Sequence, residues 1–394
     1  MSDPIVPSDF PSRTRIVFGP GRIDELGSLA REWSARRALL VTDPTLTRLG
    51  HAERARAALT GAGIEVVVFD AVRENPDSDD VDACLAVARE ANVDTLVGLG
   101  GGSSLDTAKG CNFLLTNGGR MADYWGRDKA TRPMLPMIAV PTTAGTGSEC
   151  QSFALIADAS THAKMACGDT KAAPRIALLD PVLTLTQPRH VTADTGVDTL
   201  THALEAAVTT ARTASSSALA RHAFTLAITN LPLVLDQPND LEARGRMQLA
   251  AAYAGLAIEG SMLGAAHSAA NPLTAHHGVV HGRAVGLTIA PVIRHNAGAP
   301  AVAALYAELA LAAGLARADA QPPRAVHALL DALDRLLEHA GQPRSLPAAG
   351  VERPDVPALA AEAARQWTAR FNPRPVSEDD FARFYRSLAS AGPT

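Results

Sequence analysis

The chain changes its hydrophobic pattern near Gln187 and Pro188, and this change constrains the fold more than any other feature. Before it, short apolar runs alternate with helical segments, which predicts βαβ units and a largely parallel sheet. The predicted strands are residues 37–42, 64–69, 95–99, 137–140 and 176–179, and the predicted helices include 52–60 and 81–92. We therefore expect an α/β domain over residues 1–188.

After this point β-branched runs become rare. Amphipathic segments rich in Ala and Leu predict a second domain, all helical, over residues 189–394. Its predicted helices are 197–210, 216–230, 240–258, 284–293, 301–313, 323–339, 356–369 and 378–389. A chain of 394 residues is long enough for two domains.

Composition excludes several classes of protein. The net charge is −5 with no basic run, and only 4% of residues are aromatic, so no nucleic-acid partner is expected. The four cysteines lie far apart without CxxC spacing, so neither a zinc ribbon nor a disulfide framework is expected. The first residues lack the basic and apolar regions of a secretion signal, and no stretch reaches the roughly 18 apolar residues that span a bilayer. We expect a soluble cytoplasmic protein without a membrane partner.

A glycine cluster at residues 98–109 follows one predicted strand and opens a helix. Three consecutive glycines let backbone N–H groups approach a phosphate closely, and Ser103 and Ser104 can cap the helix and donate to oxygens. The spacing differs from GxGxxG, so the dinucleotide fingerprint is not met. The cluster indicates phosphate binding, and a purely structural turn is the alternative.

A second loop, residues 141–149, also follows a predicted strand and carries the hydroxyl groups of Thr142, Thr143, Thr146 and Ser148. Parallel strands present their carboxyl ends at one edge of the sheet, where open α/β sheets bind ligands, so the two loops should converge there. Asp43 ends the first predicted strand. It could accept hydrogen bonds from a ribose and repel a 2′-phosphate, or cap the helix that Pro44 starts, or do both.

Asp198 and His202 are four residues apart, so they share one face of a helix that otherwise has a buried pattern. Five of the 12 histidines fall between residues 261 and 295: His267, His276, His277, His281 and His295. One Asp with two or three His is a ligand set for a divalent transition metal. The alternative is an Asp–His hydrogen bond with surface histidines. The remaining histidines, His51, His162, His190, His222, His327 and His339, lie in polar or amphipathic contexts and carry no functional prediction.

Several motifs together resemble the iron-dependent (group III) alcohol dehydrogenase family, with the pattern nearest to its lactaldehyde (propanediol) reductases. They are GGGSSLDTAK at 100–109, PTTAGTGSE at 141–149, GVDTLTHALEA at 196–206, the histidine segment, and NPRPVSEDDF at 372–381. The resemblance implies a dehydroquinate synthase-like fold, with an N-terminal Rossmann-like dinucleotide-binding domain and a C-terminal helical metal-binding domain. It further suggests a homodimer or higher homo-oligomer.

The resemblance also implies ligands and cofactors. Asp198, His202, His267 and His281 would bind Fe²⁺, or alternatively Zn²⁺, and NAD(H) is expected rather than NADP(H). The implied cofactor-binding residues are Asp43, Asn75, Gly101, Gly102, Ser103, Asp106, Thr142, Thr143, Thr146, Lys164 and Leu183.

The implied activity is that of an alcohol dehydrogenase or aldehyde reductase. The metal would act as a Lewis acid on the oxygen of a small substrate while hydride passes to or from the nicotinamide. Many relatives place a further His at the position of Asn271, which cannot act as an acid or base. His277, then His276, is a candidate replacement on an expected loop; otherwise the proton leaves through water, or the substrate is unusual. Alternatives are a maleylacetate reductase, phosphonoacetaldehyde reductase or glycerol dehydrogenase type of enzyme, or a non-catalytic nucleotide-binding protein.

Overall fold

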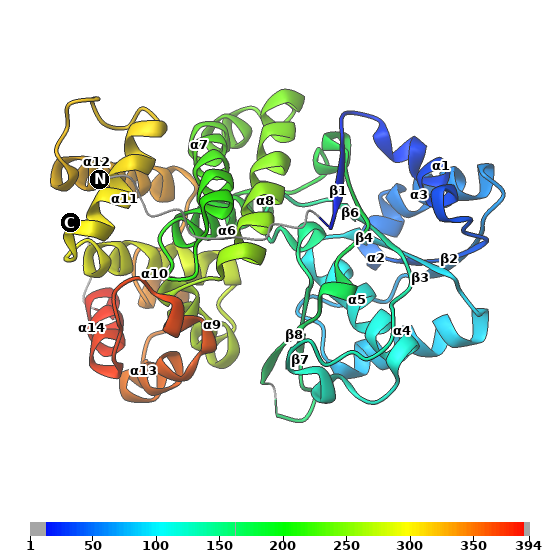
Figure 1. Ribbon diagram of the computed structural model, residues 1–394. Helices are drawn as coiled ribbons and strands as arrows, with labels where there is room; N and C mark the ends of the chain where they lie inside the picture. The colour runs from blue at the N-terminus through cyan, green and yellow to red at the C-terminus, as the bar shows by residue number, and fades with distance from the viewer. Residues whose placement is uncertain (1–12, 162, 390–394) are drawn as a thin grey trace. The chain divides into compact units, whose positions relative to one another are not determined.

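The computed structural model describes residues 13–161 and 163–389, which form two compact units that separate between Gln187 and Pro188 (Figure 1). The first 12 residues, on which the expectation of no secretion signal rests, lie outside the described residues. His162 also lies outside them. The predicted fold, an α/β part followed by an all-helical part, is confirmed.

The first unit contains a six-stranded parallel sheet in the order β1-β9-β6-β4-β2-β3. All five predicted strands are present, within a residue or so of the expected ends, and β1 is an addition that pairs with β9. The strands are β1 (Arg15–Phe18), β2 (Arg37–Val41), β3 (Glu65–Phe69), β4 (Thr95–Gly100), β6 (Met137–Pro141) and β9 (Ile176–Leu179).

Helices cover both faces of this sheet because side chains along a strand alternate between its faces. Leu39 and Val41 of β2 pack on the side of α4 (Ser78–Ala91) and α5 (Gly102–Asn117). Ala38 and Leu40 pack on the side of α1 (Leu26–Ala30) and α3 (His51–Gly61). In Figure 1, α1 and α3 are seen on one side of strands β2 and β3, and α4 on the other.

The connections reverse direction between β2 and β4. From β2 the chain runs through α3 to β3 at the sheet edge, and from β3 it returns through α4 to β4 on the other side of β2. Ligands of open α/β sheets bind beyond the carboxyl ends of strands at such a reversal. Asp43 follows β2 and the glycine cluster follows β4, so both lie at this point.

A small second sheet, which the sequence analysis did not anticipate, joins β5 (Gly126–Arg127), β8 (Lys164–Gly168) and β7 (Phe153–Ala157) in that order. β7 and β8 form an antiparallel pair, and β7 contacts α5. Short helices complete this unit: η1 (Arg22–Glu25), η2 (Arg31–Trp33), α2 (Pro44–Arg48), η3 (Met121–Tyr124), η4 (Ser148–Cys150), η5 (Thr170–Ala172) and η6 (Pro181–Thr184).

The second unit is helical, as predicted, with one helix that the sequence analysis missed. That helix is α9, an Ala-rich segment with Pro272 inside it. The elements are α6 (Arg189–Ala206), α7 (Ala214–Asp236), α8 (Leu241–Ser261), α9 (Ala265–His277), α10 (His281–Asn296), α11 (Pro300–Ala312), α12 (Pro322–His339), η7 (Pro347–Ala349), α13 (Val356–Arg365), η8 (Trp367–Phe371) and α14 (Glu378–Ala389).

Within the described part of the chain, α7 is long and apolar enough to cross a membrane by length and composition, contrary to the sequence expectation. The pair α8 and α9 passes the same test together, but the two are bent by 107°. α7 packs against α6 and α8, and residues such as Phe224 and Leu231 are fully buried there. This packing buries 44% of the apolar window of α7 within the described residues.

The contact of α1 with α3 generates a stability prediction. A Cβ on Gly27 would lie 2.2 Å from the Ala58 carbonyl oxygen and 2.6 Å from the Ala62 Cβ, so Gly27→Ala must push the helices apart. We expect a loss of about 1–3 kcal/mol, measured as a Tm several degrees lower. Gly61→Ala is the control because a Cβ there meets nothing within 4 Å. Equal Tm values for the two variants would contradict the prediction.

Candidate metal and nucleotide sites

Four side chains from three helices converge in the helical unit. α6 carries Asp198 and His202 one turn apart, α9 carries His267, and α10 begins at His281. The Asp198 Oδ1 atom lies 3.4 Å from His202 Nε2, 3.5 Å from His267 Nε2 and 3.8 Å from His281 Nε2. The rings of His202 and His267 stack at 4.8 Å between centroids.

A close helix crossing makes this convergence possible. A Cβ on Gly282 would lie 2.0 Å from the Asp194 carbonyl oxygen, so only glycine allows the start of α10 to approach α6 this closely. The next residue, Arg283, holds the Asp194 carboxylate with its Nε atom 3.2 Å from both oxygens. His281 is thereby brought beside Asp198.

Charge interactions between the carboxylates and the imidazoles shift the pKa values of this cluster. Burial alone would raise the pKa of the Asp198 carboxyl, but the surrounding imidazoles, led by His202, lower it below its usual range. Burial opposes a charge on His267, yet Glu205 and Asp198 raise the pKa of its imidazole to about 9. The carboxylates of Asp198 and Glu205 thus favour positive charge in this cluster.

The donor set fits a metal ion. Asp198 Oδ1 and His267 Nε2 are buried and make no hydrogen bond within the described residues. Ligand atoms of a tetrahedral ion with bonds of about 2.1 Å lie roughly 3.4 Å apart, close to the distances found here. Three of the four residues, Asp198, His267 and His281, already have ligand atoms within 4.8 Å of one another.

In the first unit the two predicted loops touch each other. α5 begins at Gly102, after Gly101 at its N-cap. A Cβ on Gly101 would lie 3.3 Å from Thr143 Cγ2, and one on Gly102 would lie 2.8 Å from Thr146 Cγ2. The glycine cluster of residues 98–109 and the loop of residues 141–149, called the threonine loop below, therefore form one surface at the N-terminus of α5. Backbone N–H groups and the helix dipole favour an anion there.

Two further predicted residues lie at the same edge. The backbone N–H of Asn75, whose φ is 53°, donates to Ser103 Oγ at 3.2 Å. Asp43 caps α2, with Oδ1 accepting from the N–H groups of Thr45 at 2.8 Å and Leu46 at 3.1 Å. Its Oδ2 makes no hydrogen bond among the described residues, so Asp43 can cap the helix and accept from a ligand at once.

Other predicted cofactor residues have their side chains inside the protein. Asp106 is buried, and its Oδ1 accepts from the Ser148 hydroxyl at 2.6 Å and its Oδ2 from the Leu155 N–H at 3.2 Å. Leu183 is fully buried in the core, and Thr142 is 4% exposed. Lys164 is exposed at the start of β8.

A buried lysine, which the sequence analysis did not single out, joins the two motifs. Lys109 is fully buried, and its Nζ donates to the Ser148 carbonyl at 2.6 Å, the Ser148 Oγ at 2.7 Å and the Phe153 carbonyl at 2.9 Å. Ser148 also holds Asp106. The last residues of the GGGSSLDTAK motif therefore fasten the threonine loop and β7 to α5.

The histidines near Asn271 are not in a loop, as had been expected, because α9 runs through His277. At about 100° per residue, His276 points roughly 180° away from His267, and its Nε2 lies 2.5 Å from Glu362 Oε2. His277 is exposed at the end of α9. Asn271 is half-buried one turn beyond His267 and donates to Gln366 Oε1 at 3.2 Å.

Glu205 is a residue that the sequence analysis missed. Its Oε2 lies 2.6 Å from His267 Nδ1, and its Oε1 accepts from the Ala266 N–H at 2.6 Å. Its spacing was a usable signal, because Asp198, His202 and Glu205 recur at i, i+4 and i+7 and so share one helix face.

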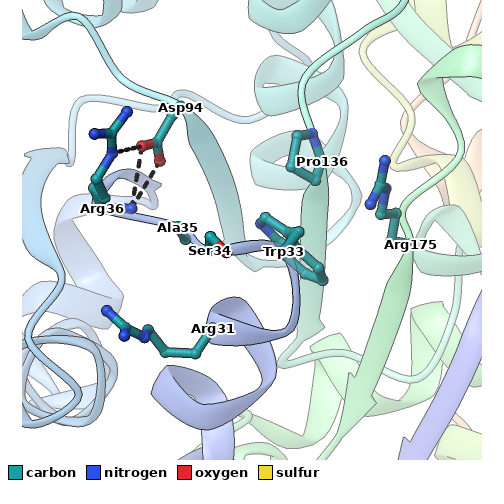
Figure 2. Close-up of a pocket in the computed structure, with 8 residues that line it drawn as sticks. All are labelled: Arg31, Trp33, Ser34, Ala35, Arg36, Asp94, Pro136 and Arg175. Carbon is teal, nitrogen blue, oxygen red and sulfur yellow. Dashed lines mark hydrogen bonds and ion pairs between the residues drawn. The ribbon is translucent and has the colours of Figure 1, made fainter.

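A separate cavity of about 630 Å³ lies at the opposite ends of the strands, beside the amino ends of β2, β4, β6 and β9. Figure 2 shows Asp94 there, bonded to Arg36. The lining residues are Arg31, Trp33, Ser34, Ala35, Arg36, Asp94, Pro136 and Arg175. None of the predicted site residues is among them.

Comparison with known proteins agrees with this geometry over nearly the whole chain. Residues 13–181 match the family profile described as iron-containing alcohol dehydrogenase, and residues 192–389 match that of the C-terminal part of the Fe-containing alcohol dehydrogenase family. The NAD-dependent methanol dehydrogenase of Bacillus methanolicus is 33% identical over 371 residues, 94% of this chain and 97% of that protein. The 1,3-propanediol dehydrogenase of Klebsiella pneumoniae is 34% identical, over 94% of this chain and 95% of that protein.

Solved structures show the same fold. A 1,3-propanediol oxidoreductase superposes with a TM-score of 0.93 at 32% identity, covering 96% of this chain and 99% of that one. A sulfoacetaldehyde reductase from Bifidobacterium kashiwanohense in complex with NAD⁺ gives a TM-score of 0.88 at 30% identity, covering 98% of this chain and all of that one. The protein is a metal-dependent alcohol dehydrogenase or aldehyde reductase. More specifically, the chain belongs to the iron-containing (group III) alcohol dehydrogenase family.

The buried Glu149 of the threonine loop generates a pH prediction. Burial raises the pKa of its carboxyl to about 7, so between pH 4.5 and 7 the unfolded chain loses a proton that the folded chain keeps. Stability should therefore fall as pH rises through this window, by on the order of 3 kcal/mol.

Glu149→Gln should remove most of this slope, which thermal unfolding at pH 5 and pH 8 will measure. Glu74→Gln, at an exposed position of the same unit, is the control. A slope that is unchanged in Glu149→Gln would contradict the assignment.

Proposed function

We propose that this enzyme is an NAD(H)-linked, iron-dependent alcohol dehydrogenase or aldehyde reductase that holds its metal with Asp198, His202, His267 and His281. The observation that carries the proposal is the convergence of three imidazole Nε2 atoms within 3.8 Å of one buried carboxylate oxygen. When bound, the metal supplies Lewis-acid polarisation of the substrate oxygen. Zn²⁺ is the alternative ion, since it binds the same donors more tightly.

The residues around the metal position have defined tasks. Asp198 offsets part of the metal charge, and the imidazoles complete the donor set as neutral ligands. Asp198, His202 and His267 are nearly inaccessible to solvent, whereas the His281 side chain is 26% exposed. The exposed side of the cluster, at His281, is where we propose that a substrate oxygen enters. A metal-free reductase or a non-catalytic protein would leave a costly buried charge cluster without a purpose.

We propose that the touching loops bind the cofactor. Gly101, Gly102 and Ser103 would hold the pyrophosphate with Thr143 and Thr146, supported by contacts from Asn75 and Lys164. Asp43 would accept from the adenosine ribose through its available Oδ2. Asp106, Thr142 and Leu183 would act from inside by holding these loops in place, as their burial indicates.

The relatives named for methanol, 1,3-propanediol and sulfoacetaldehyde support a proposal for the substrate class. We propose a small primary alcohol and its aldehyde. Asn271 would line the approach as a neutral amide rather than as a proton carrier, and His277 is a weaker candidate for proton transfer because it is exposed.

We also propose that the enzyme works in the cytoplasm as a homodimer or higher homo-oligomer. Cys84, Cys111, Cys150 and Cys167 are all buried free thiols, which supports a reducing compartment. β1 lies at the edge of the large sheet, and Phe18 on it is 41% exposed, which supports an edge available to another copy.

The metal assignment gives a direct prediction. Asp198→Asn or His281→Ala should lose bound metal and most turnover, because each removes a ligand from the convergent set. NAD⁺ binding should persist, because the nucleotide loops belong to the other unit. Elemental analysis and NADH fluorescence titration measure the two properties.

His327→Ala is the matched control, because His327 belongs to the same unit but is exposed and bonded to Asp331. Metal content close to wild type in both ligand variants would show that the ligand assignment is wrong.

The cofactor assignment gives a second prediction. Wild-type enzyme should prefer NAD(H), because a 2′-phosphate would meet the negative charge of Asp43. Asp43→Asn keeps a side-chain oxygen that can cap α2 and should improve kcat/KM with NADP⁺ relative to NAD⁺ by about tenfold, roughly 1.4 kcal/mol. Equal kcat/KM for both cofactors in the wild type would refute this role for Asp43.

A further inference from the structure

We infer that Glu205 is the positioning residue that presents His267 to the metal, and that Asn372 of the NPRPV segment holds the helix that carries both contacts. The inference rests on the proposed metal site. Glu205 is 3% exposed, so its carboxylate is buried and needs a fixed partner. That partner is His267, whose Nδ1 lies 2.6 Å from Glu205 Oε2.

This hydrogen bond selects one tautomer of the imidazole. A carboxylate only accepts, so Nδ1 of His267 carries a proton toward Glu205, and Nε2 is the ring nitrogen left to bind a metal. Nε2 is the atom that faces Asp198 Oδ1 at 3.5 Å. A carboxylate behind a ligating histidine fixes the orientation of the ring and raises its basicity as a ligand.

The second oxygen of Glu205 ties it to the start of α9. The helix has Gly264 at its N-cap and no side-chain cap of its own. Its first N–H groups are instead accepted from outside: Ala266 N–H by Glu205 Oε1 at 2.6 Å, and Ala265 N–H by Asn372 Oδ1 at 3.3 Å. Glu205 also gains from the helix dipole, which favours an anion at this end.

Gly264 leaves the space that both caps occupy. A Cβ at this position would lie 3.0 Å from Glu205 Oε1 and 3.1 Å from Asn372 Oδ1. Asn372 is fixed in turn by Asn296, with which it exchanges hydrogen bonds of 3.1 and 2.7 Å, and by the Arg374 carbonyl. The NPRPV segment thus acquires a role: it anchors α9 beside α6 and so keeps Glu205 in register with His267.

The test is Co²⁺ binding to metal-depleted full-length protein, followed by d–d absorption and by competition with a chelator. In Glu205→Gln the carboxamide can donate to Nδ1, which would place the imidazole proton on Nε2, toward the metal position. We expect Co²⁺ affinity to fall 10–100-fold, with a changed d–d spectrum, while NADH binding stays within twofold.

The matched control is Tyr385→Phe. It removes a buried hydrogen bond of 2.7 Å to the Ala269 carbonyl on the same helix and leaves the Glu205–His267 pair intact. We expect lower thermal stability with Co²⁺ affinity and spectrum unchanged. If Tyr385→Phe weakens Co²⁺ binding as much as Glu205→Gln does, loss of helix stability explains the effect and the inference is overturned.

Two further comparisons distinguish an error in the proposed metal site from an error in the role of Glu205. If Asp198→Asn retains metal, the proposed metal site itself is wrong. If Asp198→Asn loses metal while Glu205→Gln binds Co²⁺ with wild-type affinity and spectrum, only the role of Glu205 is wrong. Should Glu205→Gln fail to fold, Glu205→Asp keeps the carboxylate on a shorter arm. Weaker Co²⁺ binding by that variant with an unchanged Tm would support the inference, and unchanged binding would overturn it.

Discussion

One buried carboxylate, Asp198, sets the conditions for the helical unit. A carboxylate removed from water is costly unless positive or hydrogen-bonding groups surround it, and here three imidazoles do so. They come from three helices, so α6, α9 and α10 must cross within side-chain reach of one point. Gly282 permits the approach of α10 to α6, and Gly264 admits the groups that hold α9. The close crossing of α6, α9 and α10 is therefore tied to one buried charge.

The α/β unit depends in the same way on one buried cation. Lys109 carries its ammonium group into the protein and binds three acceptors on the threonine loop and β7. Its partner Ser148 also binds Asp106, so two polar residues of a conspicuous motif act beneath the loops rather than on a ligand. Within this motif, Asp106 and Lys109 thus join two loops, and the residues proposed to bind a nucleotide are the ones that precede them. The surface proposed for the cofactor is then the contact of Gly101 and Gly102 with the threonines.

Sequence patterns predicted those parts of the structure that depend on local periodicity. Strands β2, β3, β4, β6 and β9 and most helices were predicted because burial imposes apolar runs or a regular apolar spacing. β5 was missed because it has two residues, β1 because it is mostly exposed, and β7 (FALIA) and β8 (KMACG) because they hold few β-branched residues. α9 was missed because Pro272 interrupts its pattern. At the site, Asp198 and His202 were predicted from spacing within one helix, and His267 and His281 only from the family resemblance. Local spacing places Glu205 on the same helix face as Asp198, but its contact with α9, a helix distant in sequence, is contained in no local pattern.

On helix α9, the direction in which a histidine side chain points determines which group it contacts. His267 faces the Asp198 carboxylate, whereas His276, on the opposite side, pairs with Glu362. Asn271 lies one turn beyond His267 and is bonded to Gln366, so this position retains a polar link to the segment after α13. An amide neither takes nor releases a proton near pH 7. The Asn271 side chain therefore makes this contact without adding a titrating group at the position. With the role proposed for Asn271, the pH dependence of catalysis would originate in other groups.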